Sequence, residues 1–368
     1  MPELFPQQPK TPHEPSKPRL TKPASAEATA DKPASSDQEL HSLSILTPAD
    51  KQTPEYQKMR ERIDAVKAEM KRVSEDQSLT KAQRMRIISG ELMAKLAKAQ
   101  RFERKGETKL LGALFEQIKT AQEILGVKDV LGPNDIASSF GLNIEANEIP
   151  NIPFSRQELA RAHELDQFLV YRPKGVTMEY LKDYLKDKKT KDNKPFFYKQ
   201  DWYNSDPIFM EKTTGNWALT AKEVIPDSTG KNYLDQTEEA VGYIKGKVFK
   251  DSPLPAEYQE AIEEFNQVKD GIRKIISSDW STAAGKLAKL KITELTRQTP
   301  AEAYFDIFAY YLKNNERIMK NKYTWTKRLA SGGKLVRVGF FVAVGAAASD
   351  WGPGDSVGSL GVVFSRSH

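Results

Sequence analysis

The sequence of 368 residues contains no cysteine, which excludes disulfide bonds and agrees with a reducing compartment. Its four histidines, His13, His41, His163 and His368, have no spacing typical of metal ligands. No apolar run approaches the roughly 18 residues that a membrane-spanning helix needs. Because no apolar segment follows Met1, no secretory signal is predicted either. The default expectation is a cytoplasmic protein without a membrane span, with delivery to a surface by another route left open.

Another absence is confined to the last 34 residues, Leu335 to His368, which contain no Lys, Glu, Gln or Met. All eight methionines of the chain precede this tail. One explanation is structural, because Gly-rich hairpins and tight turns use few residues of these types. Apolar alternation predicts strands at 335–338 and 360–365, and the intervening residues, about twenty, would loop on the surface.

A second explanation comes from four motifs near the end of the chain. They are YTWTKR at 323–328, LVRVG at 335–339, SDWGP at 349–353 and LGVVFSRS at 360–367. Together they resemble the variable proteins of diversity-generating retroelements, whose C-terminal domain has a C-type-lectin-like fold. The resemblance is strongest over 323–367 and extends more weakly back to about residue 154.

The resemblance implies an origin for the missing residue types. In that family a reverse transcriptase copies a template repeat and miscopies its adenines, so that Asn codons become varied codons ending in a pyrimidine. Such codons never encode Lys, Glu, Gln, Met or Trp. Trp351 is therefore implied to be a constant position, and so are residues that fall between the template Asn codons. These constant positions are Val338, Gly339, Phe341, Gly345, Trp351, Pro353, Ser356 and Leu360.

The same pattern implies a variable region at 337–359 that contacts the ligand. Its positions are Arg337, Phe340, Val342, Val344, Ala347, Ser349, Asp350, Gly352, Gly354, Asp355, Val357, Gly358 and Ser359. Arg337 and Phe340 are the expected anchors, because arginine and aromatic side chains dominate binding hot spots. The valines would add apolar area, and the two aspartates would orient a polar or cationic partner. Varied side chains supply shape and charge rather than a placed nucleophile and base, so the predicted site binds without catalysis.

The remainder of the chain predicts an α+β protein with several parts. Residues 1–52 are rich in Pro, Ser and Lys and are expected to be a disordered arm. Apolar periodicity predicts three helices within 53–130, forming a helical hairpin or a small helical bundle that provides self-association. Residues 131–153 are expected to be a linker. The C-type-lectin-like domain would then occupy 154–368, with a helical insertion at about 250–298.

Local signals within this last domain predict individual elements. Ser155 with Glu158, and Thr299 with Pro300 and Glu302, have the spacing of helix starts. Another helix is predicted to begin at Thr177. Strands are predicted at 168–172 and 217–225, and apolar residues at helical spacing predict helices over 233–249 and 258–272. The resemblance implies that the first and last strands pair and that Trp325 and Trp351 lie in the core.

Two functions of different classes remain open at this stage. The first is non-catalytic recognition of a macromolecular ligand, most plainly a protein, with no cofactor and no metal. The alternative is a basic helical scaffold that associates with nucleic acid and has a fixed C-terminal domain. It depends on residues 80–110, which hold nine Lys or Arg and three Glu. In that case, charge reversal at Lys95, Lys98, Arg101 and Arg104 should abolish salt-sensitive binding to DNA or RNA.

Overall fold

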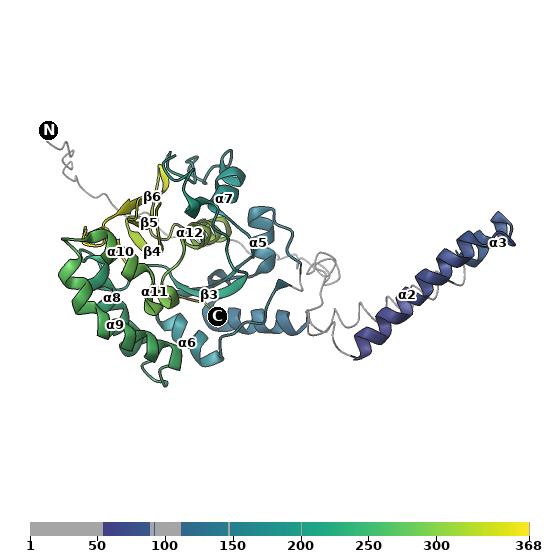
Figure 1. The fold of residues 1–368 in the computed structure, drawn as a ribbon, viewed down its shortest axis with the longest axis horizontal. Coiled ribbons are helices and arrows are strands. Elements are labelled where there is room, and N and C mark those ends of the chain that lie inside the picture. The colour runs from purple at the N-terminus through teal and green to yellow at the C-terminus, as the bar shows by residue number, and fades with distance from the viewer. Residues whose placement is uncertain (1–53, 89–91, 93–111, 146–147, 200, 368) are drawn as a thin grey trace, which may run out of the picture. The chain divides into compact units, whose positions relative to one another are not determined.

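The computed structural model describes residues 54–88, 92, 112–145, 148–199 and 201–367 (Figure 1). The chain divides into two units, Met1–Ser42 and Leu43–His368, of which the first lies outside the described residues. The expected disordered arm at 1–52 also lies outside them. So do the four basic residues on which the nucleic-acid alternative depends.

Helices form where the N-terminal apolar pattern predicts them. Helix α2 spans Pro54–Glu75 and α3 spans Lys81–Ile87. The backbone N–H of Thr80 donates to Oε1 of Gln83 at 2.9 Å, and the N–H of Gln83 donates back to Oγ1 of Thr80 at 3.3 Å. This reciprocal capping satisfies two donors that the start of α3 leaves unpaired. A further helix covers residues 112–125.

Two four-stranded sheets make the described domain a mixed α+β structure. The first has the order β1-β2-β3-β8, and the second has the order β6-β5-β4-β7. Strands of the first sheet are β1 (Val130–Leu131), β2 (Gln167–Arg172), β3 (Asn216–Ala221) and β8 (Ser365–Ser367). Strands of the second are β4 (Tyr323–Leu329), β5 (Leu335–Val342), β6 (Gly345–Trp351) and β7 (Leu360–Gly361). The last strand pairs with β3, so the expected pairing of the first and last strands is wrong.

Helix α12 (Pro300–Asn314) contacts strands of both sheets. The Thr299–Glu302 capping box and Pro300 start it, as the sequence predicts. Every residue from Pro300 to Tyr311 is buried. Aromatic residues of the helix share one apolar core with Val170 of β2 and Val338 of β5. The helix is therefore central, and its two buried carboxylates, Glu302 and Asp306, form ion pairs with the buried Arg172.

Residues 131–153 do not form the linker that the sequence predicts. They contain α5 (Pro133–Phe140), and their apolar side chains belong to the core around α12. Ile136 and Phe140 are 1% and 0% exposed, so this segment folds as part of the domain. Gly, Pro and Asn punctuate the segment and resemble a linker, but its isoleucines and phenylalanine need burial. Helices α6 (Arg156–Glu164) and α7 (Met178–Leu185) follow, starting at the predicted caps Ser155 and Thr177.

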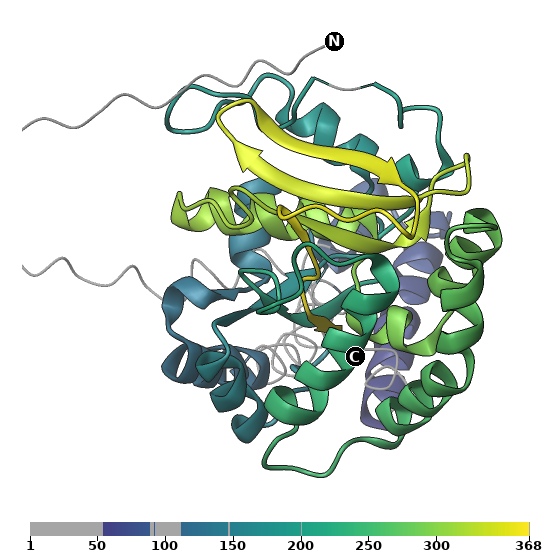
Figure 2. The ribbon, with the colours of Figure 1, turned by 90° about the vertical axis from the view of Figure 1, so that its left-hand side faces the viewer.

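Four helices pack against the second sheet on the face opposite α12 (Figure 2). They are α8 (Tyr233–Tyr243), α9 (Ala256–Ile275), α10 (Trp280–Ala288) and α11 (Lys291–Thr296). Short π and 3-10 turns lie at Ile244–Val248, Val127–Asp129 and Pro207–Phe209. Trp325, Leu335 and Leu360 of the sheet are buried among the four helices. These side chains form a second apolar core, separate from the one around α12. Burial of one helix face in this core explains why the insertion is helical and amphipathic.

The tail forms a β5–β6 hairpin where the sequence predicts a long surface loop. Residues Gly345–Trp351 lack apolar alternation, but they pair with β5 as an antiparallel strand, with a register shift between Gly339 and Val342. The outer edge of β6 is covered as well, because Ala346 N–H donates to the carbonyl of Phe196 and Tyr198 N–H donates to the carbonyl of Ala346, both at 2.8 Å. Backbone pairing on both sides thus makes a strand from a segment with weak propensity.

Candidate ligand-binding surface

The strand register places part of the tail on the outer end of one sheet face. Arg337 of β5 lies opposite Trp325 of β4 and opposite Ser349 of β6. Directly opposed residues point to the same side of a sheet, as do residues two apart on a strand. Tyr323 and Trp351 therefore share this face with Arg337. The insertion helices cover Trp325, whereas Tyr323 and Trp351 are only half-buried.

Four side chains of this face form a continuous stack, which we call the aromatic stack. The rings of Phe340 and Tyr323 are parallel within 11°, with centroids 5.2 Å apart. The guanidinium carbon of Arg337 lies 4.3 Å from the centroid of the Tyr323 ring and 3.5 Å from that of Trp351. A cation between two ring faces is attracted to both, by about 0.5–2 kcal/mol for each ring. The stack thus alternates Phe340 and Arg337, which are implied to be variable, with Tyr323 and Trp351, which are not among the implied variable positions.

Arg337 has an unusual electrostatic position within this stack. The residue is 8% exposed, and its Nε–H donates to Oγ of Ser349 at 2.6 Å. Within the described part of the chain, no carboxylate forms an ion pair with its guanidinium. Burial lowers the pKa of Arg337 from its ordinary value, and the negative charge of Asp355 only partly opposes this effect. The side chain is therefore a desolvated cation that still lacks a counter-charge.

The neighbouring groups add to the charge pattern of this surface. Burial raises the pKa of the Tyr323 hydroxyl, while the positive charge of Arg337 acts in the opposite direction. Asp355 is exposed and accepts a hydrogen bond of 2.8 Å from the backbone N–H of Gly352. Its carboxylate therefore orders the turn after β6 and lies near the cation without pairing with it.

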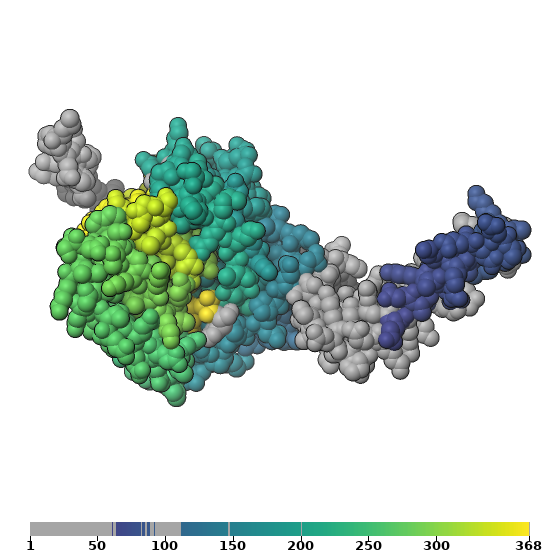
Figure 3. All heavy atoms as spheres, in the orientation of Figure 1, coloured from purple at the N-terminus to yellow at the C-terminus, as the bar shows by residue number. Residues whose placement is uncertain are grey.

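Burial separates the two sets of positions that the template pattern implies. Eleven of the thirteen implied variable positions are half-buried or exposed, namely Phe340, Val342, Val344, Ser349, Asp350, Gly352, Gly354, Asp355, Val357, Gly358 and Ser359. Six of the eight implied constant positions are buried, namely Val338, Gly339, Phe341, Gly345, Pro353 and Leu360. Hairpin atoms reach the surface between the insertion helices and the segment before β3 (Figure 3). The solvent-facing part of the tail is thus mainly its implied variable part.

Not every implied variable position contributes to the aromatic stack and its surroundings. Asp350 is paired with Val336, so its side chain points to the face opposite Arg337. Val344 is 53% exposed and lies at the turn between β5 and β6, beyond the end of the stack. Ala347 is 7% exposed and adds little surface. The structure brings together Arg337, Phe340 and Ser349, with Asp355 nearby.

Tyr323 is the main contributor that the sequence reasoning did not single out. Its ring separates Phe340 from Arg337 and so joins the two expected anchors into one surface. A signal was available, because Tyr323 stands two residues before Trp325 in the YTWTKR motif, and residues two apart share a face once this motif forms β4. Trp325 is 1% exposed and lies in the core as expected, while Trp351 is half-buried and belongs to the stack.

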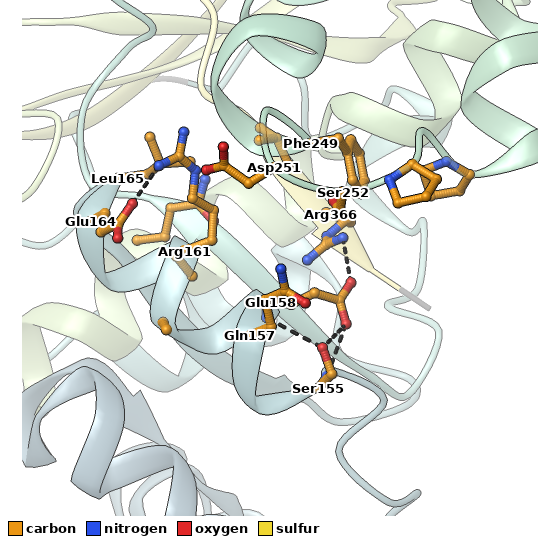
Figure 4. Close-up of a pocket in the computed structure, with 16 residues that line it drawn as sticks. Ser155, Gln157, Glu158, Arg161, Glu164, Leu165, Phe249, Asp251, Ser252 and Arg366 are labelled. Carbon is orange, nitrogen blue, oxygen red and sulfur yellow. Dashed lines mark hydrogen bonds and ion pairs between the residues drawn. The ribbon is translucent and has the colours of Figure 1, made fainter.

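A cavity of about 400 Å³ lies elsewhere, between α6 and the segment around residues 248–255 (Figure 4). Arg366 lines it, with its guanidinium carbon 5.0 Å from the Phe154 ring centroid and 5.3 Å from that of Phe249. Its Nη1 donates to Oε1 of Glu158 at 2.8 Å, so this arginine is already neutralised. The cavity contains none of the implied variable positions, and we do not place the site there.

Comparisons with known proteins do not assign the chain to a family. A scan against models of protein families matches none, and searches of curated proteins and of solved structures return no match. Over the described residues, no group of three or more His, Asp or Glu side chains is arranged to hold a metal ion. The described helices also include none with the length and apolar character to cross a bilayer.

Proposed function

We propose that this chain is a hypervariable binding protein, diversified at its C-terminal surface by a retroelement and built on a C-type-lectin-like domain. Its proposed role is non-catalytic recognition of a macromolecular ligand, a protein in the first instance. The motifs near residues 323–367 support the family assignment. The mixed α+β architecture agrees with the fold class of this domain, but the implied pairing of the first and last strands is not found.

The observation that carries the proposal is the match between two independent divisions of the tail. The template pattern separates positions by codon, whereas burial separates them by contact with solvent. The two divisions agree at eleven of thirteen variable positions and at six of eight constant ones. A fixed structural cap has no reason for such agreement. A surface whose residues are varied requires this agreement, because changes in volume or polarity at buried positions destabilise the fold.

The side chains of the aromatic stack, half-buried at the three rings and buried at Arg337, are of types that suit adhesion. Phe340, Tyr323, Arg337 and Trp351 are of the types that dominate protein interfaces, and they lie next to one another. Aromatic side chains contribute large contact areas for few rotatable bonds, so little conformational entropy is lost on binding. The half-buried stack is also held by the sheet before any ligand arrives, which lowers the cost of ordering it.

The nucleotide sequence of the gene and its neighbourhood tests the proposal directly. We expect a reverse transcriptase gene nearby and a template repeat related to the codons for residues 337–359. Differences between template and gene should fall only where the template has adenine. Differences spread over all four bases, or the lack of any repeat, would contradict retroelement diversification.

A protein experiment tests the division of the tail without reference to the gene. One variant replaces Phe340, Val342, Ser349 and Asp355 by Asn, and its control replaces Val338, Phe341, Ala348 and Leu360 by Asn. We expect the first to keep a cooperative thermal transition and the second to lose it, because only the second buries four amide groups without partners. Equal loss in both variants would show that the hairpin does not accept rewriting at the exposed positions.

A further inference from the structure

The guanidinium of Arg337 has no acidic partner in the described structure, and this indicates which chemical group a partner must bring to the aromatic stack. We propose that the partner is a protein that presents a carboxylate, from an acidic side chain or from its C-terminus, to the terminal nitrogens of Arg337. This inference rests on the proposed function, because it concerns the same surface. It goes further by naming the group that the surface recognises.

The guanidinium is held in one orientation before binding. Tyr323 and Trp351 face it from both sides, and Ser349 accepts the hydrogen bond of its Nε–H. What remains is the edge formed by the two terminal nitrogens. A planar carboxylate fits such an edge through two parallel hydrogen bonds, and these charge-assisted bonds are stronger than neutral ones.

Four other arginines of the domain that are buried or partly buried have an acidic partner, whereas Arg337 and Arg297 have none in the described structure. The pairs are Arg172 with Asp306, Arg317 with Asp192, Arg328 with Glu211 and Glu294, and Arg366 with Glu158.

Arg297 also lacks an acidic partner in the described structure, but it is 2% exposed. Its Nε and Nη1 are enclosed and have no hydrogen-bond partner there. In contrast, the terminal nitrogens of Arg337 are not among the enclosed unbonded atoms, although the residue as a whole is only 8% exposed. A carboxylate bound to them would supply the counter-charge that the chain does not.

The surrounding charges favour a carboxylate over a polyanion such as nucleic acid. Asp355 is exposed and close enough for its charge to affect Arg337. A phosphate backbone would bring many negative charges past this aspartate, whereas one carboxylate can be placed on the arginine alone. The rings of Phe340 and Tyr323 offer apolar contact beside the cation, as protein interfaces commonly do.

The test uses the full chain and two random peptide libraries. One library is amidated at the C-terminus, so that only side chains carry carboxylates, and the other has free C-termini and no Asp or Glu. Binders from the first library identify side-chain recognition, and binders from the second identify C-terminal recognition. Their affinities are then measured for the wild type, for Arg337→Gln and for Arg337→Lys by fluorescence polarisation, with and without inorganic phosphate.

We expect peptide affinity to fall at least tenfold in Arg337→Gln and to be only partly kept in Arg337→Lys, because an ammonium group lacks the flat paired edge. Replacing the peptide's own carboxylate by an amide should cost the wild type a similar factor and cost Arg337→Gln almost nothing. Unchanged thermal melting of the variants serves as the folding control. Competition by phosphate at equal concentration is expected to be negligible.

The outcomes distinguish failure of carboxylate recognition from failure of the proposed binding function. Peptides whose affinity is unchanged in Arg337→Gln but lost in Phe340→Asn would overturn carboxylate recognition and leave the binding surface in place. Peptides whose affinity is unchanged by substitution at every variable position would contradict the proposed function itself. If neither library yields a binder, or if phosphate displaces the peptides efficiently, carboxylate recognition is wrong.

Discussion

Arg337 and Arg366 belong to the same tail and lie against pairs of aromatic rings, yet their surroundings differ. Arg366 has Phe154 and Phe249 beside it and a carboxylate of Glu158 on its Nη1. Arg337 has Tyr323 and Trp351 beside it and only a hydroxyl as hydrogen-bond partner. The first arrangement is complete without a ligand. The second is missing the component that a partner would provide.

The difference shows that one chain end provides both a buried structural segment and a partly exposed surface. Residues 360–367 lie almost entirely in the core and join the two sheets through β7 and β8. Residues 337–359 lie partly outside and share their strands with constant neighbours. Alternation along a strand lets one side chain carry stability while the next meets the solvent. Four predictions, in order of expected effect, sharpen this contrast.

The largest effect is expected at a constant glycine of the hairpin. Gly345 has a φ of +99°, and a Cβ there would lie 2.3 Å from the carbonyl carbon of Phe197. Gly345→Ala should therefore lower the free energy of unfolding by about 3 kcal/mol or more, because the backbone of Phe197 and Tyr198 must move and the positive φ is unfavourable for alanine. Chemical denaturation with urea measures the change.

Gly358 provides the matched control for that substitution. It is an implied variable position, it lacks a positive φ, and a Cβ there would meet nothing within 4 Å. Gly358→Ala should change the free energy of unfolding by less than about 0.5 kcal/mol. Similar losses in both variants would mean that the constant and variable glycines are not distinguished by packing.

A smaller effect is expected from removing the paired arginine. Arg366→Gln leaves Glu158 without its ion-pair partner and should cost about 2 kcal/mol, less than a fully buried pair because Glu158 is partly exposed. Arg337→Gln should cost less than about 1 kcal/mol, because removing a desolvated cation without an ion-pair partner offsets the lost contacts with two rings, and no carboxylate loses a partner. A larger loss for Arg337→Gln than for Arg366→Gln would reverse the comparison.

The same pair predicts a pH dependence. Burial alone would raise the pKa of Glu158, but hydrogen bonds from Ser155 and the charge of Arg366 outweigh it and lower the pKa below its ordinary value. A depressed pKa contributes stability above the unfolded-state value, about 4.3, and that stability is lost as the pH falls through the folded-state pKa. The stability difference between wild type and Arg366→Gln should therefore shrink below about pH 4 in urea titrations.

The smallest effect on stability is expected at Phe340. Its φ of +53° is unfavourable for a side chain of this kind, by about 1–2 kcal/mol, and asparagine tolerates it better. Phe340→Asn relieves this strain but loses the stack on Tyr323, which contributes about 0.5–1.5 kcal/mol. The two changes should nearly cancel in thermal melts, to within about 1 kcal/mol. A loss of several kcal/mol would show that Phe340 is a core residue rather than a surface anchor.

Much of the fold follows from local signals, and the rest depends on partners distant in sequence. The starts of α6, α7 and α12 are predicted because their capping residues satisfy the first backbone donors locally. Strand β6 is missed because Gly345–Trp351 has no apolar alternation and becomes a strand only between β5 and the segment near Phe197. Residues 131–153 are mistaken for a linker because turn residues conceal their buried apolar side chains.

The site shows the same limit. The codon pattern that the resemblance implies, together with residue type, predicts Arg337 and Phe340 as anchors without any structure. Their connection through Tyr323 depends on the register between β4 and β5, which the sequence does not state. The opposite orientation of Asp350 likewise depends on its pairing with Val336. The sequence therefore predicts the composition of the surface better than its geometry.

The backbone cover over the outer edge of β6 has a consequence for solubility. An open strand edge pairs readily with strands of other molecules, and this tendency grows when its side chains are apolar. Phe196 and Tyr198 occupy the hydrogen-bonding groups of Ala346, and the indole of Trp202 donates to the carbonyl of Ala348. On the proposed function the side chains of this hairpin vary. Contacts at Ala346 and Ala348 from residues outside 337–359 would then oppose edge pairing there for any sequence of the variable positions.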